Sequence, residues 1–241
     1  MNSPFTRKTL SFLRALKRNN DREWFRARKL EYEQHVRGPM IELLARLAVD
    51  LPRFAPELIS DPRASLYRIY RDTRFSEDKT PFKTHVGAHF PSKGFLRNEG
   101  SGLYFEIAPA WVWIGGGLYM PSSADLQCLR EHIALKHRTL HRIATASSFR
   151  RAVGRLEGER LTRVPRGYVK DHPAAYYLQF KQFLAGREFE ADLAISDRFY
   201  PELMKIFQTV APLVRFLNVP LLRRPEGRPA LASGEARIRR T

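Results

Sequence analysis

Apolar side chains in the N-terminal part of the chain recur at helical spacing. Phe12 and Leu16 share one face of a helix predicted over residues 9–17. A second, longer helix is predicted to begin at Asn20, which we expect to be its N-cap. We expect Pro39 to kink or divide this helix. Its stripe of large side chains comprises Trp24, Arg28, Tyr32, Val36, Met40, Leu43, Leu44, Leu47 and Leu51.

From residue 65 onward the period of the apolar positions changes from about 3.6 to about 2 residues, which is typical of β-strands. The connections are short, so an antiparallel sheet is favoured over parallel strands joined by helices. We expect Gly115-Gly116-Gly117 to form a tight turn that ends this block, with backbone N–H groups that offer a supplementary contact for an anion. The predicted strands are SLYRIY, HVGAHF, GLYFEIA and WVWIG, which begin at residues 65, 85, 102 and 111.

The C-terminal part of the chain combines predicted helices with one predicted strand. Ser122 and Ser196 are expected to cap helices, and Gly154 is expected to end a short one. Pro212 is expected to end or bend the last helix. The remaining elements are a helix from Pro173 that carries Tyr176, Tyr177, Phe180 and Phe183, and a fifth strand, FEADLAI, that begins at Phe189.

Residues 223–241 differ in composition from the rest of the chain. They contain six Arg, two Glu and almost no large apolar side chain, so we expect a disordered basic tail. We interpret residues 1–222 as a single domain of the α+β class, with a mainly antiparallel sheet flanked by helices.

The composition excludes several classes of protein. Sixteen Phe, nine Tyr and three Trp supply a hydrophobic core, which excludes a fully disordered chain. The single cysteine, Cys128, has no partner for an intramolecular disulfide, and the apolar run at residues 10–13 is too short for a secretory signal. Pro and Gly residues interrupt the longest uncharged stretch, residues 107–124. We therefore expect a cytoplasmic protein without a membrane span.

The net charge narrows the kinds of partner. Forty-two Lys and Arg against twenty-five Asp and Glu leave a formal charge of +17, so the protein attracts anions. The expected partner is an anionic small molecule or nucleic acid, and an acidic membrane surface also fits the charge. Charge alone does not rank these partners, and the sequence indicates neither an oligomeric state nor a cofactor.

The densest group of polar side chains lies in residues 68–83, between two predicted strands. Loops that a sheet holds in place are common positions for binding groups. In the alternative interpretation, Asp72, Glu77 and Asp78 pair with the neighbouring cations and only fix the loop; the two roles are compatible. Arg and Lys side chains offer planar forks and point charges to a phosphate or carboxylate, so the candidate ligand-binding residues are Arg68, Arg71, Arg74, Lys79 and Lys83.

Three residues are candidates for catalysis if the protein is an enzyme. Asp72 and Asp78 are candidate bases, and His172 is a candidate acid because histidine titrates near neutral pH. In the alternative interpretation, His172 caps the helix that follows it. No metal site is expected. His85 and His89 would lie about 13 Å apart along a predicted strand, too far to share a metal. His137 and His141 have no neighbouring Cys or carboxylate to complete a ligand set.

Several spaced motifs resemble one known family. RDTRFSEDKTPFK at residues 71–83 and THVGAHF directly after it resemble the family's signature, and NNDREWF, GLYFEIAP, IGGGLYMP, PRGY and DHP occur in the family's order. Over residues 5–222 the chain thus resembles a widespread bacterial family of uncharacterised proteins, the conserved domain of unknown function 2461. The resemblance implies one conserved domain; it implies no particular reaction, cofactor or catalytic residue.

Three functional hypotheses follow from the residues. The first is an anion-binding domain that holds a phosphate or carboxylate ligand at residues 68–83. The second is an enzyme that acts on a phosphorylated or nucleotide-type substrate. The third is a nucleic-acid-binding protein driven by net charge and the basic tail. Four aromatic residues are expected in the core, but a subset of them exposed beside Arg71 would offer a surface on which bases stack: Trp24, Tyr104, Trp111 and Trp113.

Overall fold

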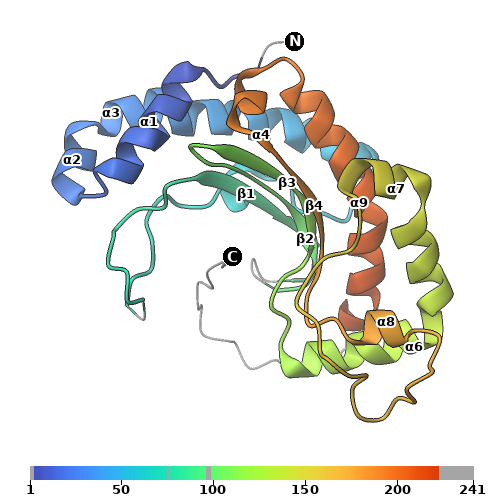
Figure 1. Cartoon of the computed structure of the whole chain (residues 1–241). Coiled ribbons are helices and arrows are strands. Elements are labelled where there is room, and N and C mark those ends of the chain that lie inside the picture. Colours follow the sequence, from blue (N-terminus) through green and yellow to red (C-terminus); the bar gives the residue numbers. More distant parts are fainter. Residues whose placement is uncertain (1–2, 75, 96–98, 223–241) are drawn as a thin grey trace.

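The computed structural model describes residues 3–74, 76–95 and 99–222. This part of the chain forms a single α+β domain in which helices flank an antiparallel sheet (Figure 1), as the apolar pattern predicts. The predicted tail, residues 223–241, lies outside the described residues. The strands are β1 (Val86–Pro91), β2 (Gly102–Ile107), β3 (Trp111–Leu118) and β4 (Phe183–Glu190), and each pairs with the next in chain order.

The helices lie mainly on one face of the sheet and at its ends. Helix α9 packs against the sheet, and α6 and α7 pack against α9. The helices α1 to α4 gather at one end of the sheet (Figure 1). The helices are α1 (Arg7–Arg18), α2 (Arg22–Ala27), α3 (Lys29–Tyr32), α4 (Gly38–Asp50), α5 (Pro62–Ser65), α6 (Ser123–Thr145), α7 (Ser147–Val153), α8 (Ala175–Leu178) and α9 (Phe199–Leu222). Shorter turns are the π-helical η1 (Glu33–Arg37) and the 3-10 helices η2 (Leu51–Arg53) and η3 (Ala191–Ile195).

Side chains alternate between the two faces of the sheet, as expected for strands. Phe90, Phe105 and Ile114 are fully buried on the face that packs against α9. Tyr104 and Trp113 point to the other face and are only partly buried, so their predicted place in the core is wrong. In the part of the chain that the structure describes, no helix covers that second face.

The N-terminal helical region is divided more often than its pattern predicts. The N-cap of α2 is Asp21, not Asn20, and its carboxylate accepts hydrogen bonds from two backbone N–H groups of the first turn. The last residue of α2 is Ala27, and the backbone leaves helical geometry at its C-cap, Arg28. Pro39 lies in the first turn of α4, where a missing N–H costs no hydrogen bond.

The first predicted strand, at residues 65–70, is wrong. Asp61 caps the short helix α5, and Ser65 is the last residue of that helix. Beyond it the chain is extended but meets β1 only at an isolated bridge between Leu66 and Ala88. The residues alternate like a strand because one side packs on the core, although no continuous ladder forms.

The predicted turn at Gly115-Gly116-Gly117 is also wrong, because all three glycines lie inside β3. β3 is a central strand, so the backbone groups of this run pair with β2 and β4. The glycines are needed for close approach: a Cβ atom built on Gly115 would lie 2.2 Å from the carbonyl oxygen of Ala185. The supplementary anion contact expected at this run is therefore not supported.

Several C-terminal boundaries differ from the prediction. Helix α8 ends at Leu178, and Phe183 opens β4 rather than lying on a helix. The predicted strand at Phe189 contributes only its first two residues to β4, because a 3-10 helix follows. Helix α9 begins at Phe199, beyond the predicted cap Ser196, and continues past Pro212 to Leu222. The caps at Ser122 and Gly154 are confirmed.

Candidate functional site

The segment with the densest polar chemistry forms a long loop beside β1 (Figure 1). Its two sides run antiparallel: the N–H of Arg71 donates to the carbonyl of Pro81 (2.9 Å), and the N–H of Lys83 donates to that of Ile69 (2.8 Å). Arg68 and Lys83 therefore lie near the base of this loop, and the residues between them project away from the sheet.

Asn20 fastens the base of the loop to the N-terminal helices. Its side-chain amide donates to the carbonyl of Phe82 (2.8 Å), and its side-chain oxygen accepts from the N–H of Phe82 (3.0 Å). The ring of Phe82 also stacks on Phe25 in α2, with ring centroids 4.2 Å apart. The NNDREWF and RDTRFSEDKTPFK motifs, far apart in sequence, thus meet in space.

Arg71 is held inside the loop. Its guanidinium donates to the carboxylate of Asp78 (2.7 Å), to the carbonyl of Thr80 (3.3 Å) and to the Thr80 hydroxyl. A further contact reaches the hydroxyl of Ser76 (3.4 Å). These partners use several of the donors of the guanidinium within the protein. The structure therefore favours a structural role for Arg71.

Arg74 and Lys79 are also engaged within the loop. Arg74 makes a two-pronged ion pair with Asp72, with Nε–Oδ1 and Nη2–Oδ2 distances of 3.0 and 2.7 Å. The ammonium of Lys79 donates to the carbonyl of Thr73 (3.0 Å). The ion pairs of Asp72 and Asp78 agree with the alternative interpretation from the sequence, in which acids of the loop fix its cations, whereas Lys79 is bound by a backbone carbonyl.

The same contacts lower the pKa of both carboxylates. Hydrogen bonds from Arg74 lower the pKa of Asp72 to about 2. Hydrogen bonds from the backbone and hydroxyl of Thr80, and then from Arg71, hold the pKa of Asp78 well below its usual range. A general base is most effective when its pKa lies near the working pH. Both carboxylates therefore suit ion pairing better than proton abstraction.

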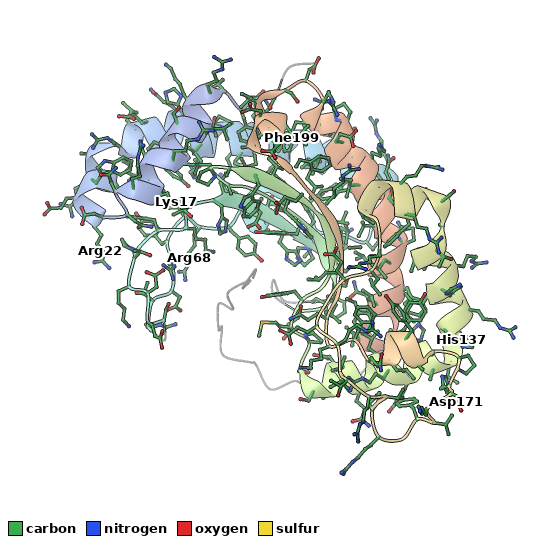
Figure 2. The ribbon with its side chains drawn as sticks, viewed as in Figure 1. Lys17, Arg22, Arg68, His137, Asp171 and Phe199 are labelled. Carbon is green, nitrogen blue, oxygen red and sulfur yellow. The ribbon has the colours of Figure 1, made fainter. Side chains whose placement is uncertain are left out.

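Arg68 and Lys83 face a different environment from the other three candidate cations. Both line an open groove of about 750 Å³ between the N-terminal helices and the start of the loop. Figure 2 shows Arg68 beneath these helices at the inner side of the loop. Within the described residues, the cations that line the groove are Lys29, Arg37, Arg63, Arg68 and Lys83.

Acidic residues offset only part of this charge. Among the described groove residues the acids are Glu33 and Asp72. Glu33 accepts a 3.0 Å hydrogen bond from Arg37, and Asp72 already pairs with Arg74. The exposed side chains of Arg63 and Arg68 thus give the groove a positive potential.

Tyrosines form part of the wall of the groove. Tyr32, Tyr67 and Tyr70 line it together with the cations. The ammonium of Lys83 lies 4.9 Å from the ring centre of Tyr67, a cation–π distance that positions the ammonium at the rim of the groove. The groove therefore combines point charges, guanidinium forks and aromatic surface.

A smaller hollow of about 360 Å³ continues the basic surface. It shares Phe25, Lys29 and Tyr70 with the groove and adds Arg22 and Arg26 from α2. The sequence reasoning missed these arginines, and it also missed Lys29, Arg37 and Arg63. Four of them lie at least 30 residues before the loop, and Arg63, five residues before it, belongs to the separate helix α5, so the motif did not include them.

His172 lies far from the loop. Its neighbour Asp171 stands at the opposite end of the molecule from Arg68 (Figure 2). The Nδ1 atom of His172 accepts a hydrogen bond from the N–H of Ala174 (3.0 Å), and its ring lies 6.3 Å from that of His137. The N-cap of α8 is Ala174 and no side chain caps this helix, so His172 stabilises the turn before α8 and does not cap it as the alternative interpretation expected. The structure does not bring together the three candidate catalytic residues.

Two features are absent from the described part of the chain. No group of three or more His, Cys, Asp or Glu residues is arranged there to hold a metal ion. None of the described helices combines the length and the apolar character that are needed to cross a membrane.

Comparison with known proteins yields one match. The model of the family described as conserved hypothetical protein (DUF2461) matches residues 8–216. This range contains the loop, both walls of the groove and the sheet. No curated protein matches the chain.

Proposed function

We propose that this protein, which belongs to the DUF2461 family of conserved hypothetical proteins, binds a phosphorylated small molecule in the basic groove. The observation that carries the proposal is the set of exposed or partly buried cations around one groove, with Arg63, Arg68 and Lys83 close to its tyrosines. A phosphate group carries more charge at neutral pH than a carboxylate and has more acceptor oxygens. Phosphate is therefore the better fit for several converging cations.

The base of the loop forms one wall of this groove, and contacts within the protein hold the loop in place. Asn20 and Phe82 fix its base to the N-terminal helices, and the Arg71–Asp78 pair (2.7 Å) closes its outer part. Because the loop is held at both levels, we expect Arg68 and Lys83 to keep their places in the groove that Lys29 also lines. Prearranged charges bind more tightly, since less conformational entropy is lost on binding.

Calorimetric titration of the full chain with pyrophosphate and with ribose 5-phosphate tests the proposal. We expect Arg63→Ala/Arg68→Ala to weaken binding at least about tenfold, because hydrogen bonds to charged groups contribute about 1.5–3 kcal/mol each. Arg138→Ala/Arg151→Ala, two exposed arginines on α6 and α7, is the matched control. It removes the same charge from residues outside the groove and is expected to change binding little.

Two results would contradict the proposal. One is equal loss of affinity in both double variants, which would mean that only net charge matters. The other is a loss confined to Arg71→Ala/Arg74→Ala, which would return the ligand to the outer part of the loop. Thermal unfolding of each variant identifies effects that arise from a disrupted fold.

Nucleic acid is a second candidate ligand, favoured by the hollow that contains Arg22 and Arg26 next to the groove. Fluorescence anisotropy with a labelled single-stranded oligonucleotide tests it. The logarithm of the affinity is expected to fall with that of the salt concentration at a slope of about −0.7 per phosphate neutralised. Arg22→Ala/Arg26→Ala must weaken this binding; if only truncation after Leu222 does so, residues 223–241 carry it instead.

An enzyme is the third candidate. The assignment of Asp72, Asp78 and His172 as its catalytic residues has less support. The two carboxylates are engaged in ion pairs, and Asp171, the neighbour of His172, lies at the opposite end of the molecule from Arg68 (Figure 2).

A further inference from the structure

The face of the sheet away from α9 carries a continuous row of aromatic rings. Tyr67 lies 6.4 Å from His89 and 6.1 Å from Tyr104, measured between ring centres. Tyr104 in turn lies 6.0 Å from Trp113. Tyr67 comes from the extended segment beside β1, and His89 comes from β1 itself. Tyr104 and Trp113 come from the central strands β2 and β3. We call this set of four residues the aromatic row.

Glycines lie under two rings of the aromatic row. A Cβ atom built on Gly186 would lie 2.2 Å from Cζ2 of Trp113, and one built on Gly102 would lie 2.4 Å from Nε2 of His89. Since a Cβ atom on this face points away from the sheet, these two rings occupy the space above the glycines. The rings of Trp113 and His89 therefore lie close against the backbone, while Tyr104 is tilted by 44° from Trp113 and stands edge-on to Tyr67.

A buried carboxylate lies next to the row on the same face. Glu106 is only 4% exposed, and its Oε2 atom accepts a hydrogen bond from the hydroxyl of Tyr104 (2.7 Å). The Nε2 atom of His85 lies 3.4 Å from the same oxygen. Burial and the nearby carboxylate raise the pKa of the Tyr104 hydroxyl well above its ordinary value, so Tyr104 remains a donor and holds Glu106 in place.

The aromatic row meets the basic groove at Tyr67. This ring lines the groove and is covered on one side by the ammonium of Lys83. The Tyr67 ring also contacts the rings of His89 and Tyr104. A ligand with its phosphate among the cations thus has partly buried aromatic rings within reach.

We infer that the aromatic row binds the base of a nucleotide whose phosphate occupies the groove, which rests on the proposed phosphate site. Nucleobases stack on Tyr, Trp and His rings, and the cations beside Tyr67 supply the phosphate contact. Guanosine 5′-monophosphate (GMP), whose two-ring base offers a large stacking surface, is the probe.

Titration of the full chain with GMP, ribose 5-phosphate and guanosine tests this inference, with tryptophan fluorescence and calorimetry as readouts. GMP is expected to bind about tenfold more tightly than ribose 5-phosphate, because stacking on one aromatic side chain contributes a factor of this order. Trp113→Ala is expected to remove this difference and to leave the affinity for ribose 5-phosphate unchanged. Tyr176→Ala, a half-exposed aromatic on α8, is the control that is expected to change neither.

The outcomes separate the aromatic row from the groove. Equal affinities for GMP and ribose 5-phosphate, both reduced by Arg63→Ala/Arg68→Ala, would overturn the base site and leave the phosphate site standing. Quenching by guanosine that Trp113→Ala abolishes, without phosphate binding, would support the row and contradict the groove. If Trp113→Ala fails to fold, nuclear Overhauser effects between the base H8 proton and the Trp113 indole in the unmodified chain decide, and their absence overturns the inference.

Discussion

Gly115 and Gly186 pair across the two strands β3 and β4, directly beneath Trp113. The two glycines have different neighbours. At Gly186 an added Cβ meets the ring of Trp113, whereas at Gly115 it also meets the carbonyl of Ala185 at 2.2 Å. A ring is able to tilt, but a carbonyl in a central ladder moves only if the sheet distorts. The glycines therefore set both the strand packing and the position of the ring.

We expect Gly186→Ala to lift Trp113 from the sheet at a cost of about 1–3 kcal/mol of stability, the usual penalty for overpacking. The tryptophan emission should shift to longer wavelength as the indole becomes more exposed. Gly115→Ala is expected to cost more, because its Cβ clashes with backbone. Denaturant unfolding and emission spectra measure both effects, and an unshifted spectrum in Gly186→Ala would contradict the position of the ring.

The loop carboxylates have pH-dependent contributions to stability. The pKa of Asp72 falls from 3.8 to about 2 on folding, and that of Asp78 falls as well. A lowered folded-state pKa means that stabilisation is fully present above the unfolded-state value and is lost as the pH falls toward the folded-state value. Both carboxylates thus favour the folded loop at neutral pH.

The melting temperature is therefore expected to decrease as the pH is lowered from about 4 to about 2. This window lies between the unfolded-state pKa of Asp72, 3.8, and its folded-state pKa, about 2. In Asp72→Asn/Asp78→Asn part of this pH dependence should disappear, and stability at pH 7 should be lower than in the unmodified chain. Thermal unfolding at a series of pH values measures this. Identical pH profiles for the two proteins would show that other carboxylates are responsible.

At the scale of elements, the connection between α1 and α2 holds the loop. Asn20 lies in this connection and makes both of its hydrogen bonds to the backbone of Phe82. One wall of the groove comes from α3 and η1, through Lys29 and Arg37, and the other comes from the loop base. Asn20 therefore sets the separation between the two walls.

We expect Asn20→Ala to destabilise the protein by about 1–3 kcal/mol, because it leaves a partly buried N–H and C=O without their partners. Affinity for pyrophosphate should fall as well, since the walls of the groove are no longer held together. Asn19→Ala is a close control, because the Asn19 amide only donates to Ala15 within its own helix (2.9 Å). Equal behaviour of the two variants in unfolding and titration would count against this role for Asn20.

At the scale of the whole molecule, the two ends of the described chain share one core. The rings of Phe5 and Phe199 lie 5.8 Å apart, edge to face. The hydroxyl of Tyr200 donates to the carboxylate of Asp50 (2.6 Å). Near the end of α9, the side chain of the buried Asn218 accepts from the N–H of Ser101 (2.7 Å) and donates to its carbonyl (2.9 Å), directly before β2. The N-terminal helices and α9 are thus joined by contacts of long sequence separation.

Such a shared core predicts one cooperative unfolding transition. The calorimetric and van't Hoff enthalpies should agree, and signals from tryptophan and from far-ultraviolet circular dichroism should change together. Asn20→Ala is expected to shift this one transition without dividing it. A separate early transition of the N-terminal helices would show that they form an independent unit.

Local patterns of the sequence were sufficient for much of this architecture. Apolar residues that recur every 3.6 or 2 positions predict α1, α4, β1, β2 and the start of β3. They do so because the residues on one face of a helix or strand are set by their spacing along the chain. The caps at Ser122 and Gly154 were readable for the same reason. The loop was also recognisable as the densest group of charges.

Contacts between distant segments decided the rest. The sequence did not show which cations of the loop are engaged internally, because Arg71 and Arg68 look alike until Asp78 and Thr80 are placed beside one of them. Glycine in a run suggested a turn, but the approach of β4 requires it inside β3.

The order of residues by itself therefore determined the α+β class, most of the elements and the presence of a charged loop, since these depend on interactions between near neighbours. Only the tertiary structure decided that Lys29, Arg37 and Arg63 join Arg68 in one groove, and that an aromatic row extends from it. The physical reason is that both surfaces combine side chains whose separation in space is set by packing and not by their spacing along the chain.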